Sequence, residues 1–193
     1  SPDGSNRREL FDSTPSSYDG YAAWSPDGTD CAYALWSEED RGIYIIPALG
    51  GAPRKVVDTP HGIAGIDWSP DGRRLAYASR DDVGQPLKIY LYSATTGESR
   101  SLTSPITNSG GDYFPAFSPD GKRVAFCRRD RTGLQDIFVV ATEGGEPRRL
   151  TYSQHYIAGL DWLPDGKSVV YAVTEPAKKD EREVKRVRHP ADR

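Results

Sequence analysis

Two histidines and two aspartates are the residues of this sequence whose types and spacing could do chemistry. Each stands five or seven residues before a Trp or Phe, and the four are Asp19, His61, Asp112 and His155. Imidazole nitrogens and carboxylate oxygens can bind borderline and hard metal ions. They can equally hydrogen-bond the backbone amides of their own loops. No Glu or third His completes a ligand set, so we predict no metal or other cofactor and take the four as a candidate binding site.

No motif for covalent catalysis accompanies these residues. The sequence has no Gly-x-Ser-x-Gly nucleophile elbow, no Gly-rich phosphate loop and no Cys-x-x-Cys pair. The third histidine, His189, lies in a basic segment without a serine elbow. The sequence therefore predicts that this chain is not itself an enzyme.

A pentapeptide recurs four times along the chain. Residues 24–28 and 68–72 both read Trp-Ser-Pro-Asp-Gly, and residues 117–121 and 162–166 each differ from it at one place. The aromatic residues are 44, 49 and 45 residues apart, a period typical of propeller blades or solenoids. Pro presets φ, Asp tolerates the bridge region and Gly supplies a positive φ, so each copy predicts a tight hairpin.

The residues around each hairpin predict the strands of a blade. The second strand reads apolar, small, aromatic, small, as in residues 75–78, which fits a sheet that is packed on both faces. A third and a fourth strand follow in three of the units, and four antiparallel strands in ~45 residues are a β-propeller blade. We predict an all-β fold, a partial β-propeller of about four blades with four antiparallel strands each. Cys31 and Cys127 are expected to be buried small hydrophobic residues rather than a disulfide.

The repeat predicts one array of blades over residues 1–173, with hairpins at 24–28, 68–72, 117–121 and 162–166. Residues 5–10 match a closing strand, so we expect the chain to open in mid-blade. Residues 174–193 are expected to be a charged tail or a truncated blade, because the spacing of three between Val184 and Val187 is not a strand period. The charged hairpin tips at 37–42, 80–86 and 128–135 are expected to be solvated turns.

The four candidate residues each stand just ahead of an innermost strand. Inner strands run alongside the axis of a propeller, so we predict that Asp19, His61, Asp112 and His155 face a common opening at one mouth of the channel. Asp67 and Asp161, which directly precede Trp, are expected to bond backbone amides or a neighbouring turn and to have no catalytic role.

The phrase Trp-Ser-Pro-Asp-Gly, then Leu-Ala-Tyr-Ala-Ser, Ile-Tyr-Leu-Tyr and Arg-x-Leu-Thr, resembles the TolB-like or PD40 (WD40-like) propeller repeat. The resemblance covers residues 1–173 and is specific for the fold rather than for the function. The repeat family includes periplasmic TolB proteins, propellers ahead of prolyl-oligopeptidase-type serine hydrolases, and sensor propellers. A periplasmic or other extracytoplasmic location is implied by this resemblance alone.

Two functions stay open at this point. One is a non-catalytic platform that binds a protein or peptide partner, and the alternative is the substrate-gating propeller of a prolyl-oligopeptidase-type (S9) serine peptidase without its hydrolase domain. A hydrolase or lyase within the propeller would need clustered acid–base residues in the channel. The net charge is −3 with dispersed basic residues, and no apolar run exceeds one strand, so we expect neither nucleic-acid binding nor a membrane span. Self-association through open blade edges is a further expectation.

Overall fold

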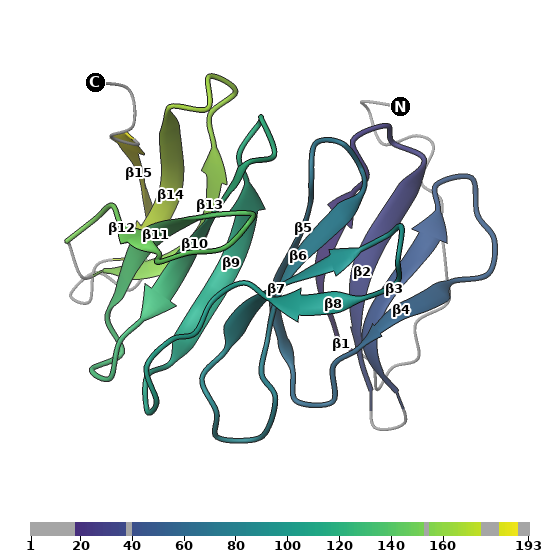
Figure 1. Ribbon diagram of the computed structural model, residues 1–193, viewed down its shortest axis with the longest axis horizontal. Coiled ribbons are helices and arrows are strands. Elements are labelled where there is room, and N and C mark those ends of the chain that lie inside the picture. The colour runs from purple at the N-terminus through teal and green to yellow at the C-terminus, as the bar shows by residue number, and fades with distance from the viewer. Residues whose placement is uncertain (1–17, 38–39, 153–154, 175–181, 189–193) are drawn as a thin grey trace.

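The computed structural model describes residues 18–37, 40–152, 155–174 and 182–188, and these residues form strands and turns without a helix. The strands make four antiparallel sheets that follow one another in chain order (Figure 1). Within this part of the chain no strand of the first sheet pairs with a strand of the fourth. The prediction of an all-β, partial four-blade propeller is confirmed.

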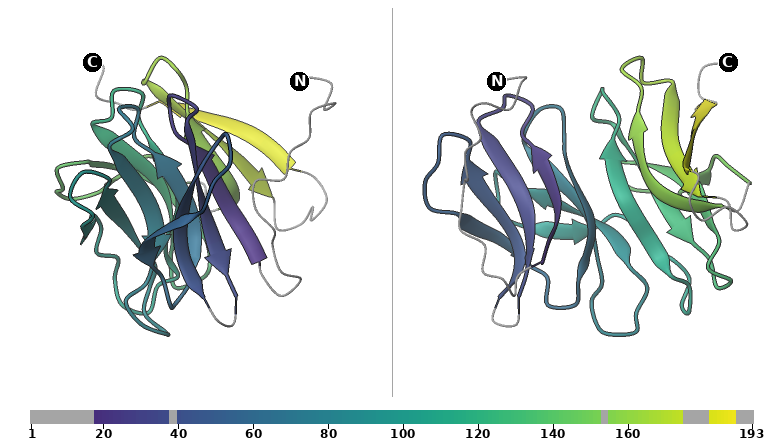
Figure 2. Two further views of the ribbon diagram at one scale, coloured as in Figure 1. Left: turned by 90° about the vertical axis from the view of Figure 1, so that its right-hand side faces the viewer. Right: turned by 180° about the vertical axis from the view of Figure 1, so that it is seen from behind.

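The blades run from blade 1 at the right of Figure 1 to blade 4 at the left, and the view from behind in Figure 2 shows the same row. Blade 1 contains β1 (Tyr18–Trp24), β2 (Asp30–Trp36), β3 (Arg41–Pro47) and β4 (Arg54–Asp58). Blade 2 contains β5 (Ile63–Trp68), β6 (Arg74–Ser79), β7 (Lys88–Ser93) and β8 (Ser99–Ser101). Blade 3 contains β9 (Gly111–Phe117), β10 (Arg123–Arg129), β11 (Gln135–Ala141) and β12 (Arg148–Arg149). Blade 4 contains β13 (Tyr156–Trp162), β14 (Ser168–Thr174) and β15 (Arg182–Arg188).

The recurring pentapeptide forms the hairpin between the first two strands of every blade. Its Gly has φ between +66° and +72° in all four copies, as the turn chemistry predicts. In the first copy the N–H of Gly28 donates to the carbonyl of Ser25 at 2.9 Å, and the Ser25 hydroxyl donates to Asp27 at 2.6 Å. The hydrogen bond from Ser25 lowers the pKa of Asp27. The turn is therefore held by its own residues.

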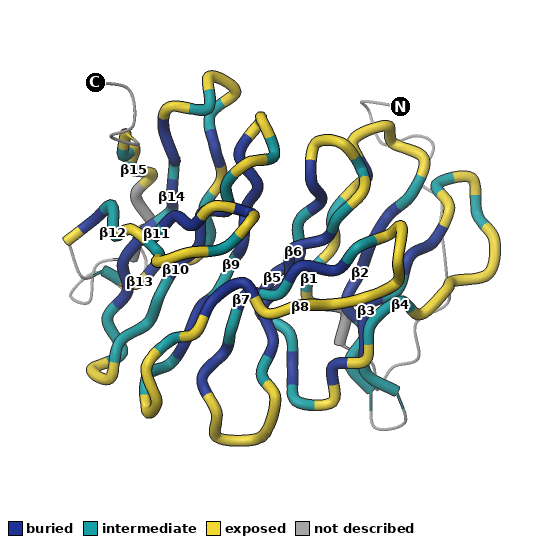
Figure 3. Tube along the Cα trace, viewed as in Figure 1, coloured by how far each residue is buried: buried dark blue, intermediate teal, exposed yellow. Residues whose placement is uncertain are grey.

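Neighbouring blades pack with a face of small residues against an aromatic face. Ala32 and Ala34 of β2 lie in one cluster with Trp68 of blade 2. In the same way, Ala76 of β6 lies in one cluster with Phe117 of blade 3. Figure 3 shows the buried stretches along the middle strands and the exposed ones at the hairpin tips and in β8. The alternation of small and aromatic residues in the second strands is thus used to bury one blade on the next.

The two cysteines lie on different kinds of face: Cys127 faces the next blade, whereas Cys31 clusters with Tyr33 and Ile46 of its own blade. Cys31 and Cys127 are both buried and free, and burial raises the pKa of each thiol. Cys127 occupies a small-residue position against blade 4, in one cluster with Trp162. The prediction that both are small hydrophobic residues, not a disulfide, is confirmed.

The Trp side chains at the ends of β5 and β13 also bond across the seams between blades. The indole Nε1 of Trp68 donates to the carbonyl of Ala23 at 3.1 Å, and Trp162 donates to Ala116 at the same distance. These two bonds join blade 2 to blade 1 and blade 4 to blade 3. They add directional contacts to the apolar packing of the seams.

The segment 182–188 forms a strand, although the spacing of its valines does not predict one. It forms β15, which pairs with β14 over seven residues, so the spacing of three between the two valines does not exclude a strand. Val187 packs against the cluster of blades 3 and 4, whereas Val184 is 73% exposed. Lys185 rather than Val184 shares the inward face with Val187, which restores the alternation of a strand. The segments 1–17, 175–181 and 189–193 lie outside the described residues, and so does the predicted closing strand at 5–10.

Candidate binding site at the start of the inner strands

The inner strands of the four blades share one orientation. Their turn ends stack on each other: a Cβ at Gly72 would lie 3.8 Å from Cδ of Pro26, and one at Gly121 would lie 3.6 Å from Cδ of Pro70. Because the turn ends of β1, β5, β9 and β13 lie side by side, their starting ends also share one side of the propeller. The predicted site residues stand at that side.

Asp112 is the most buried of the four predicted residues, with no exposed surface. Its two carboxylate oxygens accept hydrogen bonds from Arg128 at 2.7 and 2.9 Å, and its N–H donates to the carbonyl of Leu87 at 2.7 Å. Burial raises the pKa of Asp112, and the bonds from Arg128 act against this rise. Asp112 therefore ties β9 to β10 and to blade 2, and it offers no free oxygen surface to a ligand.

The expectation of solvated hairpin tips is wrong for the first residue of two tips. Arg128 belongs to the tip at 128–135, yet its side chain points inward to Asp112 and is 21% exposed. Arg80 opens the tip at 80–86, and its Nε is buried without a hydrogen-bond partner among the described residues. Each directly follows the last buried residue of a second strand, Cys127 or Ser79, so it still lies inside the blade.

His61 lines a pocket of about 210 Å³ at the seam between blades 1 and 2. Its side chain is 27% exposed, and its Nε2 lies 3.9 Å from a carboxylate oxygen of Asp82. Residues from four places in the chain line the pocket: the end of β4, the connection to β5, the end of β6 and the middle of β7. They are Asp58, Pro60, His61, Tyr77, Ser79, Arg80, Asp81 and Tyr90.

Aromatic and acidic side chains hold the wall of this pocket in place. The rings of Tyr77 and Tyr90 stack with centroids 5.3 Å apart. The Asp81 carboxylate accepts hydrogen bonds from Lys88 and from the Tyr90 hydroxyl, and these bonds lower the pKa of Asp81. Burial and the bond to Asp81 raise the pKa of Tyr90. Asp81 is already occupied, and the Nε of Arg80 is a donor of this wall that has no acceptor among the described residues.

His155 stands at the equivalent seam between blades 3 and 4. Its carbonyl accepts a hydrogen bond from the N–H of Gln135 at 3.2 Å, and its Nε2 lies 3.4 Å from Nζ of Lys185. The side-chain amide of Gln135 in turn accepts the N–H of Ile157 at 2.6 Å. The backbone of His155 therefore ties blade 4 to β11, while its half-buried imidazole sits beside a cation.

The four predicted residues start at one side of the propeller, and in the described structure His61, Asp112 and His155 do not bond one another. His61, Asp112 and His155 each contact a different neighbour. Asp19 lies in β1, paired with Leu35, and its side chain falls outside the described residues. Within the described ranges no three His, Cys, Asp or Glu side chains are placed to hold a metal ion.

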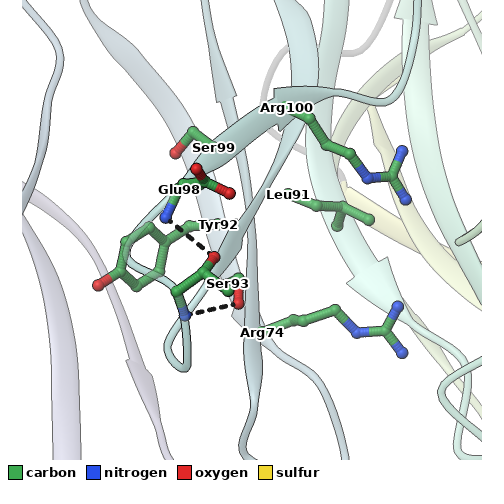
Figure 4. Close-up of a pocket in the computed structure, with 8 residues that line it drawn as sticks. Arg74, Leu91, Tyr92, Ser93, Glu98, Ser99 and Arg100 are labelled. Atoms are coloured by element: carbon green, nitrogen blue, oxygen red, sulfur yellow. Dashed lines mark hydrogen bonds between the residues drawn. The ribbon is translucent and has the colours of Figure 1, made fainter.

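A larger pocket of about 420 Å³ lies on the outer strands of blade 2, away from the predicted residues. In Figure 4 the side chains of Arg74, Leu91 and Arg100 extend in the same direction from β6, β7 and β8. Arg100 donates to the carbonyl of Thr142, and Arg74 lies 3.9 Å from Glu143. Both arginines thus reach toward blade 3, so this pocket belongs to the seam between blades.

Sequence reasoning singled out His61 but missed the residues that make its pocket. The sequence predicts Tyr77 and Tyr90 only as strand residues and Arg80 as part of a solvated tip. One local signal exists: Arg80 follows directly after the buried residue Ser79, where a long basic side chain can turn back along the blade. Which side chain it meets there depends on β4 and β7, which lie elsewhere in the sequence.

The family model of the TolB β-propeller domain, PD40, matches residues 2–188 of this chain. The chain belongs to this family. This TolB-type propeller is 35% identical over 144 residues to the Tol-Pal system protein TolB of Bordetella pertussis. The aligned region is 74% of this chain and 32% of that protein. The chain is 31% identical over 127 residues to dipeptidyl-peptidase 5 of Porphyromonas gingivalis, covering 60% of the chain and 18% of that protein.

A solved structure supports the same assignment. The putative TolB from Agrobacterium tumefaciens superposes with a TM-score of 0.70 at 28% identity, over 86% of this chain and 59% of that one. The TolB-type propeller described here thus spans about a third or less of the length of the two curated relatives above. The described residues include no helix of the length and apolar character that a membrane crossing requires.

Proposed function

We propose that this chain is a non-catalytic binding platform that holds a polar segment of a protein or peptide partner at the start of its inner strands. The observation that carries the proposal is the Nε of Arg80, which is buried beside an open pocket and has no hydrogen-bond partner among the described residues. Buried polar groups of folded proteins nearly always have a partner. A carbonyl or carboxylate of a bound segment would supply the missing acceptor.

The charges around the pocket favour a peptide-like ligand over a simple anion. Asp58 pairs with Lys55 at 2.5 Å, and Asp81 is bonded to Lys88 and Tyr90. These acids remain at the rim and would repel a multiply charged anion, whereas a backbone carbonyl needs only one donor. His61 and Asp82 lie on the same rim and can bond the amides of such a segment.

The likeness to a Tol-Pal system protein supports a platform function, and it supports an extracytoplasmic, periplasmic location as part of this proposal.

The second candidate is the substrate-gating propeller of a prolyl-oligopeptidase-type serine peptidase. It is favoured by the 31% identity to dipeptidyl-peptidase 5 and by 26% identity over 151 residues to the uncharacterised peptidase YuxL of Bacillus subtilis, of which the chain spans 21%. Under both proposals this chain alone hydrolyses no ester or peptide. Labelling of the chain by a fluorophosphonate probe would contradict this, provided that substitution of a single Ser abolishes the labelling.

The binding proposal is tested with peptides selected on the intact chain from a displayed random library, whose affinities are then measured by calorimetry. Arg80→Gln and His61→Ala are expected to weaken binding about tenfold or more without lowering the melting temperature. Arg131→Gln, on an exposed tip, is the matched control and leaves binding unchanged. Selected peptides that bind Arg80→Gln as tightly as the unmodified chain would refute the site.

A double variant tests whether the second histidine belongs to the same surface. Replacing His61 and His155 together by Ala is expected to reduce binding of a long partner segment more than His61→Ala alone, at an unchanged melting temperature. A drop in stability with binding intact would mean that both histidines only fix their loops.

A further inference from the structure

Each of the four hairpin turns places an Asp directly before a Gly. The four pairs are Asp27–Gly28, Asp71–Gly72, Asp120–Gly121 and Asp165–Gly166. Glycine has no side chain to shield its backbone nitrogen, so in an Asp–Gly pair this nitrogen can approach the carboxyl carbon of the Asp closely. Its attack there gives a succinimide ring, and hydrolysis of the ring gives aspartate or isoaspartate. The hairpins that build every blade are therefore also four candidate sites of backbone isomerisation.

The backbone holds the four turns in the same way. In every copy the N–H of the Gly donates to the carbonyl three residues earlier at 2.8–2.9 Å. One carboxylate oxygen of the Asp accepts the N–H of the residue after the Gly at 2.8–3.0 Å, again in every copy. Because all four turns share these bonds, the bonds do not make one Asp more reactive than another.

A serine hydroxyl restrains the Asp in three of the four turns. Ser25, Ser69 and Ser118 each donate to Oδ1 of the Asp two residues later, at 2.6, 2.6 and 2.5 Å. The same hydroxyls accept an N–H from the following strand at 2.9 Å, so the hairpin fixes their position. The serine bond is the largest cause of a lowered pKa in all three Asp side chains, because it stabilises the charged carboxylate.

The fourth turn lacks this bond because Leu163 stands where the other turns have Ser. Asp165 keeps the N–H of Lys167 at 2.8 Å, and its Oδ2 lies 3.5 Å from a terminal nitrogen of Arg186. The side chains of Arg186 and Asp165 are 48% and 44% exposed, so water competes with this long contact. Asp165 is thus the least restrained of the four hairpin carboxyls.

The difference between the turns arises inside each hairpin rather than between blades. A following blade is present beside each of the first three turns. Even so, the described hydrogen-bond and ion-pair partners of their Asp carboxylates all lie within three residues of the Asp. By the same pattern, a further blade beside blade 4 would leave Asp165 with the partners that it has here.

We propose that Asp165–Gly166 is the hairpin at which the backbone of this chain isomerises first. The nitrogen of Gly166 attacks Cγ of the protonated Asp165 carboxyl, an N–C bond forms, and the carboxyl OH leaves as water with the amide proton. A water molecule then opens the ring at either carbonyl. Opening at the former backbone carbonyl leaves the chain running through the side chain of residue 165, as isoaspartate. In the other three turns the serine bond disfavours both the protonated carboxyl and its rotation toward the Gly nitrogen.

Isoaspartate adds one methylene to the backbone of the turn, which acts on the seam between blades 3 and 4. A Cβ at Gly166 would lie 3.8 Å from Cδ of Pro119, and the carbonyl of Gly166 accepts a hydrogen bond from Arg123 at 3.1 Å. A longer turn displaces Gly166 from both neighbours. The modification therefore loosens blade 4 before any other blade.

Peptide mapping of the intact chain tests the proposal, because the four hairpins of one molecule serve as controls for each other. The folded chain is incubated at about pH 5, where part of each carboxyl is protonated. The succinimide is detected by the missing mass of one water, and isoaspartate by the shifted retention of its peptide. Asp165 is expected to react at least about threefold faster than each of the other three hairpin Asp residues. Equal rates in the four hairpins, or a faster rate in another of them, would overturn the proposal.

Two variants exchange the residue that makes the difference. Leu163→Ser should slow the reaction at Asp165 to the rate of the other turns, and Ser118→Ala should speed the reaction at Asp120 about threefold or more. Leu49→Ser, in an exposed turn of blade 1, is the matched control and should change none of the four rates. An unchanged rate at Asp165 in Leu163→Ser overturns the proposal, whatever Ser118→Ala does to the stability of its hairpin.

Incubation in urea separates the effect of the fold from that of the local sequence. The serine bonds are lost when the chain unfolds, so the four rates should converge. A reaction at Asp165 that stays faster in urea would mean that neighbouring residues, not the missing bond, make it reactive, and would also overturn the proposal. The Asp–Gly pairs at 3–4 and 19–20 are mapped separately, because their Asp side chains lie outside the described residues.

Discussion

Arg128 holds Asp112 through two parallel hydrogen bonds, from Nε to Oδ1 at 2.7 Å and from a terminal nitrogen to Oδ2 at 2.9 Å. The carboxylate is fully buried, and the guanidinium lies 4.9 Å from the ring centre of Phe138. The pair therefore fixes the start of β9 against the middle of its own blade. The sequence predicts Asp112 as a ligand-binding acid, but in the structure its carboxylate holds the inner strand β9 in place.

Replacing Arg128 by Ala should leave this buried carboxylate without its counter-ion. We expect the free energy of unfolding, measured with urea, to fall by about 3–5 kcal/mol. Arg128→Lys keeps the positive charge but cannot donate two parallel hydrogen bonds to Asp112. Its unfolding free energy should therefore lie between that of Arg128→Ala and that of the unmodified chain. Arg131→Ala on the exposed tip serves as the control, and a similar small loss for both Ala variants would mean that the pair contributes little.

Asp67 gives the stability a dependence on pH. Burial, together with the nearby charge of Asp161, raises its pKa from 3.8 to about 6. Because the folded-state pKa lies above the unfolded one, this group stabilises the fold below about pH 4 and loses that contribution, about 3 kcal/mol, as the pH rises through 6.

The effect is measured as the difference in unfolding free energy between the unmodified chain and Asp67→Asn at pH 4 and at pH 7. The Asn variant should be favoured relative to the unmodified chain at the higher pH. Carboxyl NMR should place the pKa of Asp67 near 6, and Asp161→Asn should lower it by removing a like charge. A relative stability that is flat between these pH values would contradict the assignment.

Two tryptophans at equivalent positions should respond differently to the same substitution. Trp68→Phe removes the hydrogen bond to the carbonyl of Ala23 and leaves a gap at a seam, so we expect a loss of about 2 kcal/mol in unfolding free energy. Trp24→Phe, measured in dilute solution, should cost less than about 0.5 kcal/mol because Trp24 is largely exposed. Equal losses would show that the seam bond is not what stabilises Trp68.

Two glycines separate backbone strain from steric exclusion. Gly84 and Gly111 both have positive φ, +83° and +93°. A Cβ at Gly84 meets nothing within 4 Å, whereas one at Gly111 would lie 2.2 Å from the backbone nitrogen of Leu87. We expect Gly84→Ala to cost about 1 kcal/mol and Gly111→Ala to cost about 2 kcal/mol more, since β9 must move away from blade 2. Thermal unfolding of the two variants side by side checks this, and equal shifts would refute the close approach.

The sequence by itself determined the features that depend on neighbours along the chain. The turn at Ser25–Gly28 is set by Pro, Asp and Gly within it, and the alternation of Ala76 and Tyr77 sets which face of β6 is small. Four copies of one local pattern were enough to predict a blade and, by repetition, an array of blades. The burial of both cysteines followed from the same alternation.

Only the tertiary structure decided which polar side chains are free to act. Asp112 and His61 stand at similar places in the repeat, yet Asp112 is occupied by Arg128, 16 residues away, while His61 lines an open pocket. Asp67 finds its amide at Phe117, 50 residues along the chain. A hydrogen bond needs its two atoms within about 3 Å, and the distance between residues so far apart is fixed by how blades pack on one another, which no local pattern records.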